Sequence, residues 1–351
     1  MNRALTILTL FVSVLTYAQQ DAYYTHFKDV IDAYNPAAAG KHHGDICLSG
    51  LTHHQWRDYT DATKQRGSEG DPNYPLNNVA PVTYNLNVST LWKLSKDSTH
   101  FLGTGLSIID DKIAYTKGTS VKLNLNYKKT FQGGYKELGV GFGVGTRNWG
   151  WVKPDYKYLD PNDPRIPASG NTASQLDLNV GVMYKQQRLS IFKDFYAGLS
   201  ITNLNAPLYT VNIGGDYTRQ FVRHYYGIVG GNINTTIMGG LVLEPALLLK
   251  YAPTNQQGEG YRPQVDLNVT ALYAGSIRGG LAIRDWATFD AVSLLIGYVK
   301  DPLEIGYSYD ITTSKVQSVS NGTHEIMVKY CIPLKTYDPK PPIIRLTPRF
   351  L

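Results

Sequence analysis

The chain has 351 residues, a formal net charge of +6, 26 tyrosines and 33 glycines. Its positive charge is spread along the chain without a block of lysine and arginine, so the composition gives nucleic-acid binding no support. Two cysteines are too few for a disulfide-rich scaffold. No run of about twenty apolar residues occurs, which excludes a transmembrane helix.

The N-terminus has the pattern of a secretory signal. A basic residue, Arg3, precedes an apolar run at 4–15, and a small residue, Ala18, stands at the expected cleavage point. The apolar run is too short to span a bilayer. We therefore predict that residues 1–18 are a signal peptide and that the mature chain is exported.

Residues 19–44 follow the signal, and they lack the alternation of a strand. Four aromatic residues accompany a turn with the sequence Asn-Pro-Ala-Ala-Ala-Gly at 35–40. Proline directs such a turn, and so many aromatic residues favour burial over a mobile leader. We predict a periplasmic segment that packs into or under the main fold as a plug, with Asn35, Pro36 and Gly40 as its motif.

From residue 45 onward, short segments alternate in side-chain character with a period of two. At 264–273, for example, Val265 and Val269 are apolar, whereas Asp266 and Asn268 are polar. Such a strand needs a different environment on each face. Lipid outside and a polar lumen inside provide these environments, whereas a soluble β-sandwich shares one apolar core. The pattern predicts an all-β transmembrane barrel.

Fourteen antiparallel strand candidates make up the predicted barrel at 45–332, and an even number is expected for bacterial barrels. The candidates lie at 45–56, 82–94, 99–110, 119–131, 136–149, 174–186, 190–203, 222–235, 240–252, 263–274, 276–286, 290–300, 302–312 and 323–332.

The connections between the candidates alternate between longer and shorter along the chain. Residues 57–81, 150–173 and 204–221 form long connections, 111–118 a medium one and 95–98 a short one. Outer-membrane barrels have short periplasmic turns and longer outer loops. We predict that both termini face the periplasm of a Gram-negative bacterium and that the long connections face outward.

No arrangement of residues in the sequence indicates catalysis. Neither a G-x-S-x-G elbow nor an H-E-x-x-H helix occurs. His42 with His43 and His53 with His54 resemble metal ligands, but neighbours on a strand point to opposite faces. We therefore expect a protein that is not an enzyme and that has no cofactor and no metal site.

The connection at 151–173 and the tryptophans beside it have ordinary structural explanations. Its three aspartates and four prolines suit a rigid surface loop better than a calcium site, because EF-hand spacing is missing. Trp149 and Trp151 fit the outer aromatic girdle of a barrel.

The predicted lumen has two features that favour a plug. The glycines at 139, 141, 143 and 145 alternate with apolar residues, so we interpret them as a strip without side chains that the N-terminal segment approaches closely. The predicted lumen side chains carry both signs of charge, which neutralise one another, unlike the charged eyelet of a porin. They are Glu137, Arg147, Lys185, Glu244, Lys250, Asp266, Arg278, Arg284, Glu304 and Glu325. A transporter of hydrophobic solutes would need an apolar lumen, which these strands do not indicate.

Several motifs are similar to those of one known family. Besides the turn at 35–40, they are Gln55-Trp56, Pro81-Val82-Thr83, Leu248-Leu249-Lys250-Tyr251, Gln264-Val265-Asp266-Leu267-Asn268, Gly306-Tyr307-Ser308-Tyr309-Asp310 and Asn321-Gly322-Thr323-His324-Glu325-Ile326-Met327. On these motifs, residues 19–332 resemble the PorP/SprF family, outer-membrane proteins of the type IX secretion system. The last two motifs and their spacing are the specific ones.

The resemblance implies a barrel that supports secretion or cell-surface anchoring of large exported proteins, such as adhesins used in gliding motility or attachment. Its expected partners are an adhesin-like secreted surface protein, other type IX secretion components and outer-membrane lipid, with no nucleic acid. The alternative is a solute-conducting outer-membrane porin or transporter.

Two features depart from the family pattern. Ala38 stands where an aromatic residue is usual, and residues 333–351 continue past the final strand. This tail is rich in proline and basic residues, so we expect an extended basic segment in the periplasm.

Cys47 and Cys331 lie on the first and last predicted strands. Barrel closure makes these strands antiparallel neighbours, and both cysteines belong to polar, lumen-facing sets near the periplasmic rim. We therefore expect the two thiols to be close. A disulfide would lock the seam in an oxidising compartment but needs a matching register, which the sequence leaves open.

Overall fold

A computed structural model describes residues 21–40, 45–59, 79–114, 116–151, 171–212, 216–237, 240–253 and 263–334. Within these ranges, no helix has the length and apolar character needed to cross a membrane. The predicted signal peptide at 1–18, the His42–His43 pair and most of the tail at 333–351 lie outside the described residues.

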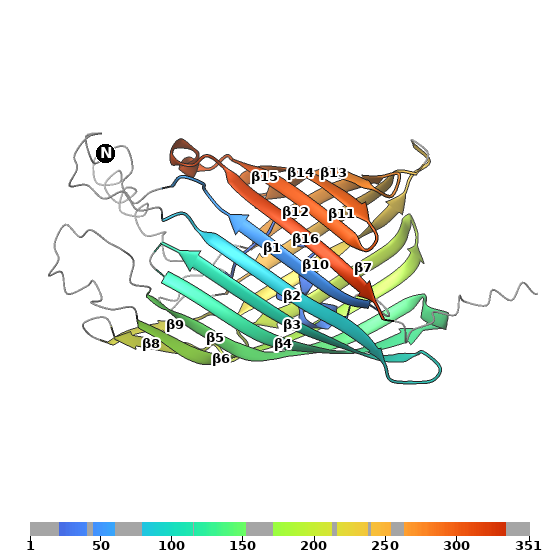
Figure 1. The fold of residues 1–351 in the computed structure, drawn as a ribbon, viewed down its shortest axis with the longest axis horizontal. Helices are drawn as coiled ribbons and strands as arrows, with labels where there is room; N and C mark the ends of the chain where they lie inside the picture. Colours follow the sequence, from blue (N-terminus) through green and yellow to red (C-terminus); the bar gives the residue numbers. More distant parts are fainter. Residues whose placement is uncertain are drawn as a thin grey trace, which may run out of the picture.

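Fourteen antiparallel strands close into one barrel in the described part of the chain (Figure 1). The predicted all-β barrel and its strand number are thus confirmed. Neighbours in sequence pair around the wall, β7 pairs with β10, and β16 returns to pair with β1. The barrel strands are β1 (Asp45–His54), β2 (Val82–Lys93), β3 (His100–Ile113), β4 (Thr116–Phe131), β5 (Lys136–Trp151), β6 (Asn171–Leu189), β7 (Phe192–Thr202), β10 (His224–Asn234), β11 (Val242–Tyr251), β12 (Gln264–Tyr273), β13 (Ile277–Arg284), β14 (Ala291–Lys300), β15 (Leu303–Thr312) and β16 (Thr323–Pro333).

The two faces of the wall differ in polarity. On β4, Lys122 and Asn124 are buried on the lumen side, whereas Val121 and Leu123 are 40% and 45% exposed on the outside. Large apolar side chains are exposed in the same way on strands all around the wall. This outer belt is suited to lipid, since a soluble barrel would have to expose it to water.

The barrel has two rims of different character. At one rim β1 begins, β16 ends and the tight turns lie, such as 274–276 between β12 and β13. The opposite rim carries the long connections, of which residues 60–78 and 152–170 lie outside the described residues. We call these the short-turn rim and the long-loop rim; they lie at the right and left of Figure 1.

The connection at 204–221 contains a hairpin that the sequence analysis did not predict. Its strands, β8 (Leu208–Asn212) and β9 (Asp216–Gln220), form a separate two-stranded sheet. Tyr209 and Val211 are buried in a cluster with Trp149 of β5. The hairpin strands have five residues each, too few for a clear period-two signal.

Two further expectations differ from the structure. The connection predicted at 111–118 is shorter, because the β3–β4 ladder continues through the pair Lys112 and Lys117. The placement of Trp149 and Trp151 in an outer aromatic girdle is wrong. Trp149 is 3% exposed and Trp151 packs beside it, because both share the inward face of β5 with Arg147 and meet the hairpin there.

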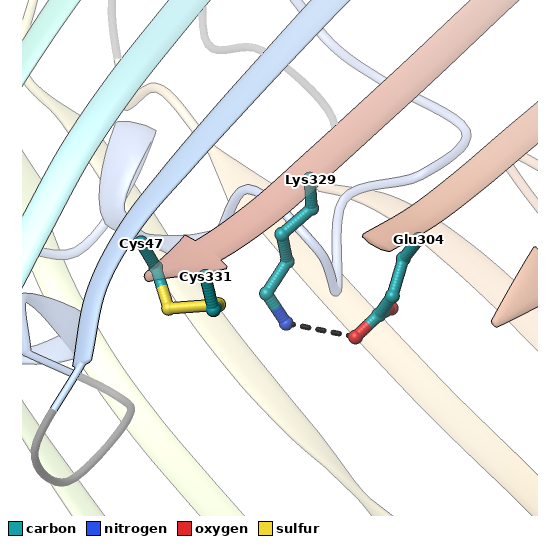
Figure 2. Close-up of a disulfide and its surroundings, with 4 residues drawn as sticks. All are labelled: Cys47, Glu304, Lys329 and Cys331. Atoms are coloured by element: carbon teal, nitrogen blue, oxygen red, sulfur yellow. Dashed lines mark hydrogen bonds and ion pairs between the residues drawn. A yellow bond between two sulfur atoms is a disulfide. The ribbon is translucent and has the colours of Figure 1, made fainter. Parts of the chain in front are cut away.

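The seam between β1 and β16 is paired along its length, from Asp45 opposite Pro333 to His54 opposite His324. Cys47 lies opposite Cys331, and their sulfur atoms are bonded, as Figure 2 shows. Both cysteines are buried near the short-turn rim. The first and last strands are therefore joined covalently as well as by the ladder.

Replacing Cys47 with serine should lower the free energy of unfolding of the barrel by about 2–4 kcal/mol, because the bond restricts the unfolded chain. Urea unfolding of the purified barrel in lipid, with and without reductant, measures the effect. Cys331→Ser should lower the free energy of unfolding by the same amount. The double variant should be no less stable than either single variant. Two freely alkylated thiols in the folded wild-type barrel would contradict the bond.

Candidate functional site: an N-terminal segment inside the lumen

Residues 21–40 lie inside the barrel, with two short 3-10 turns at Ile31–Ala33 and Pro36–Ala38. The side chains of Tyr24, Phe27 and Val30 are at most 2% exposed. They form one apolar cluster with inward-facing wall residues, namely Leu51, Met183, Tyr226, Ile228, Ala246, Leu248 and Met327. The interpretation that the lumen strands offer no apolar surface is therefore wrong, because the segment covers such a surface.

Asn35 joins the turn at 35–40 to the wall. Its side-chain oxygen accepts a hydrogen bond from the Ala37 amide at 2.9 Å, which caps the turn. Its side-chain nitrogen donates to the carbonyl oxygens of Val182 and Leu199 at 3.1 and 3.2 Å. Pro36 occupies the first position of the turn, where its fixed φ suits the geometry. The motif is thus a rigid turn anchored between β6 and β7.

The wall has no side chain where the turn approaches most closely. A Cβ atom at Gly141 would collide with the backbone of Pro36 and Ala37, and one at Gly181 would collide with the Asn35 side chain. Of the predicted glycine strip, Gly139 and Gly141 face the segment, whereas Gly143 and Gly145 meet neighbouring side chains or strands first. The N-terminal segment therefore approaches two of the four glycines closely, as predicted, and does not approach the other two in this way.

Gly40 ends the turn in a conformation that favours glycine, with φ at +73°. Its carbonyl oxygen accepts a hydrogen bond from Lys128 at 3.1 Å. Asn126 donates to the carbonyl oxygens of Ala37 and Ala39 at 2.7 and 3.0 Å. Side chains of β4 therefore satisfy three carbonyl groups that the irregular backbone leaves unpaired.

Charged groups also connect the segment to the wall. Lys28 forms an ion pair with Glu244 of β11 at 2.7 Å. The carboxylate of Glu325 on β16 accepts hydrogen bonds from the backbone amides of Thr25 and His26, at 3.0 and 2.7 Å. These contacts are buried, and each carboxylate also has a partner on the wall: Glu244 pairs with Arg278 at 3.0 Å, and Glu325 lies 2.7 Å from His53.

Charges of the wall pair with one another as well. Lys250 and Asp266 are 2.8 Å apart, and Lys329 and Glu304 are 3.0 Å apart. Lys128 and Glu137 approach within 3.4 Å. The prediction that lumen charges of both signs neutralise one another is confirmed for these groups.

The segment crosses the lumen from one rim to the other. Asp21 contacts Arg147 at 3.1 Å and accepts a hydrogen bond from Thr202, the last residue of β7, at 2.9 Å. Gly40 lies at the opposite end, beside Lys128. The described chain thus begins near the long-loop rim while β16 ends at the short-turn rim, which differs from the expectation that both termini share one side.

The Asp21 carboxyl group is ionised in its buried position. Burial raises its pKa, but the charges of His224, Arg147 and Lys122 outweigh this and hold the pKa well below its usual range. The folded-state pKa is therefore lower than the unfolded one. This contact therefore contributes stability above the ordinary aspartate pKa of about 4, and the contribution is lost progressively as the pH falls from about 5 toward the lowered pKa.

Small cavities remain between the segment and the wall. One of about 60 Å³ is lined by Asp21, Tyr34 and Arg147, among others. Another of about 30 Å³ lies beside Ala38 and Tyr196. These volumes accommodate a few water molecules, since one water needs roughly 10–15 Å³.

Besides Gly139, Gly141 and the charged lumen residues, further wall residues receive the segment, and the sequence analysis did not find them. They include Asn126, Ser200, Gly103, Gly181 and Gly306. Isolated glycines in strands with polar lumen faces were the one available signal. Of the histidines considered as ligands, His53 is buried in the lumen and His54 is exposed outside. The described residues contain no group of three or more His, Cys, Asp or Glu side chains suited to a metal ion.

Comparison with known proteins identifies the family. The model of the type IX secretion system membrane protein PorP/SprF matches residues 16–330. This chain belongs to the PorP/SprF family. The family match agrees with an outer-membrane location and with a role as a secretion component. None of the curated proteins compared with the chain matches it.

Several solved outer-membrane barrels resemble this PorP/SprF protein in fold. A FadL homologue of Pseudomonas aeruginosa is 10% identical, with a TM-score of 0.47 and coverage of 86% of this chain and 93% of that one. The toluene transporter TodX of P. putida is 9% identical, with a TM-score of 0.49 and coverage of 85% and 92%. The translocator domain of the autotransporter NalP from Neisseria meningitidis is 13% identical, with a TM-score of 0.41 and coverage of 88% and 93%. Similarity at this level carries no argument about function.

Replacing Gly141 with valine should displace the turn at 35–40, because a side chain there collides with Pro36 and Ala37. Amide hydrogen exchange of residues 21–40, followed by mass spectrometry, should become at least tenfold faster while the strands stay protected. Gly50→Val is the matched control, since a Cβ at Gly50 meets nothing within 4 Å. Equal exchange of residues 21–40 in Gly141→Val and Gly50→Val would show that the turn at 35–40 packs on the wall without needing a glycine at position 141.

Proposed function

We propose that this PorP/SprF protein is a closed outer-membrane barrel that receives or retains a large exported protein, such as an adhesin, at the cell surface. The main support is the filled lumen. Residues 21–40 occupy it and are held by contacts such as Lys28 to Glu244 and the Thr25 amide to Glu325. A filled lumen suits a docking protein better than a channel for solutes.

The segment acts as a plug in this proposal. Opening the lumen would expose the apolar cluster around Tyr24 and Phe27 to water. It would also leave Arg147, Glu244 and Glu325 in the lumen without their partners on the segment. Both costs favour the closed state in the absence of a partner.

The long-loop rim is the proposed docking face, directed outward by the rule that outer loops are the longer ones. The β8–β9 hairpin stiffens this rim, since Tyr209 packs edge-on against Trp149 with ring centroids 6.1 Å apart. Arg219 of the hairpin stacks on the Trp149 ring at 5.0 Å. Residues 57–81 and 150–173, mostly outside the described residues, belong to the same rim.

The tail at 335–351 belongs to the opposite side in this proposal. β16 ends at the short-turn rim, so a segment that follows it starts in the periplasm. Its basic, proline-rich sequence suits an extended contact with another component of the type IX secretion system.

Deleting residues 23–40 should open the lumen, and the purified barrel should then conduct ions in planar bilayers at least tenfold better than wild type. Gly50→Val again serves as the control, with wild-type conductance. A truncated barrel that inserts normally but conducts no better would show that the segment is not a plug. Solute-dependent conductance of the intact barrel would favour the porin alternative.

Replacing residues 208–220 with a short Gly-Ser linker should reduce the amount of exported protein that co-purifies with the barrel by several-fold, because the docking face loses its stiff hairpin. A matched replacement of the turn at 274–276, on the opposite rim, should leave co-purification unchanged. Quantitative mass spectrometry of detergent extracts provides the measurement. Loss of the partner in both variants, or in neither, would contradict the proposed face.

A further inference from the structure

Neighbouring lysines of β4 lie in different environments at the short-turn rim. Lys128 points into the lumen and contacts Gly40. Lys129 points outward on the same face as the exposed Tyr127 and Phe131. Its ammonium nitrogen lies 5.3 Å from the centroid of the Phe131 ring. Lys129 thus has its stem along the apolar belt and its charge at the edge of that belt, where lipid headgroups lie.

Three further cations occupy the same rim on the next strands. Lys136 of β5 is the register partner of Phe131. Arg188, near the end of β6, lies over Tyr135 with its guanidinium carbon 5.4 Å from the ring centroid. Lys193 is exposed at the start of β7. We call Lys129, Lys136, Arg188 and Lys193 the basic arc.

The charge of the basic arc is not compensated within the described chain. In the ranges that the structure covers, none of its four side chains forms an ion pair, whereas the inward-facing Lys128 pairs with Glu137 at 3.4 Å. Elsewhere on the described part of this rim, positive charge is sparser: Lys93 ends β2 with the same parity as the buried Leu91, and Lys96 is followed by Asp97. The turn at 274–276 has no charged residue, and Lys300 is followed by Asp301. Positive charge is therefore concentrated on four adjacent strands, β4 to β7.

We propose that the basic arc binds the phosphate groups of anionic phospholipids in the leaflet at the short-turn rim. Cations beside rings at the edge of the apolar belt lie at the depth of lipid headgroups. A binding site for an acidic soluble protein would instead have its cations on turn tips that point away from the bilayer. With the orientation assumed in the proposed function, the leaflet is the periplasmic one.

Lipid retention tests this proposal on the full chain. The barrel is reconstituted in vesicles of equal phosphatidylglycerol and phosphatidylcholine, extracted in mild detergent, and its retained lipids are counted by mass spectrometry. Wild type should retain phosphatidylglycerol preferentially. The variant Lys129→Gln/Lys136→Gln/Arg188→Gln/Lys193→Gln should lower the ratio by about fivefold or more, the effect expected for losing even one such contact.

Lys112→Gln/Lys117→Gln is the matched control, because these lysines lie on β3 and β4 near the long-loop rim. It should keep the wild-type ratio, and both variants should keep the heat-dependent gel mobility of a folded barrel. Equal ratios in wild type and the four-site variant would overturn the proposal. So would equal retention of phosphatidylglycerol and phosphatidylcholine by wild type. The lipid assay contains no exported partner, so a negative result there does not contradict the docking proposal. Likewise, a negative co-purification result does not contradict the lipid proposal.

Discussion

The structure depends on one constraint: an irregular segment buried in a lumen must find partners for its backbone polar groups. The wall provides them. Asn126 and Lys128 donate to carbonyl groups at 37–40, and Ser200 donates to the Tyr34 carbonyl at 2.8 Å. Lys122 reaches the Ala33 carbonyl at 3.3 Å. These polar side chains of the wall would also suit the lining of an aqueous channel. In this barrel they donate hydrogen bonds to the backbone of residues 21–40.

Much of the fold could be predicted because its signal is local. Alternation with a period of two is visible in a few residues, and the wall keeps it nearly everywhere, as on β4. It weakens on β10, where Tyr226 and Ile228 face inward and pack on the segment. The sequence pattern is therefore least clear where the lumen wall is a packing surface instead of a polar one.

The contacts of the segment could not be predicted, because they join residues far apart in the chain. Thr25 meets Glu325 across a separation of 300 residues, and nothing near either residue specifies the other. The position of Trp149 could have been predicted. It has the same parity on β5 as Arg147, which the sequence analysis already placed in the lumen, so an outer position was inconsistent with the alternation.

The path of the segment determines how the barrel can empty. A chain threaded through a ring that is sealed at its seam by Cys47 and Cys331 cannot leave sideways. Cleavage after Ala18 would give it a free end near Asp21, while five residue steps, about 17 Å, join Gly40 to Asp45. The threading therefore leaves one direction for any exchange of the segment: lengthwise toward the short-turn rim, where Gly40 connects to β1, with every strand pair of the wall intact.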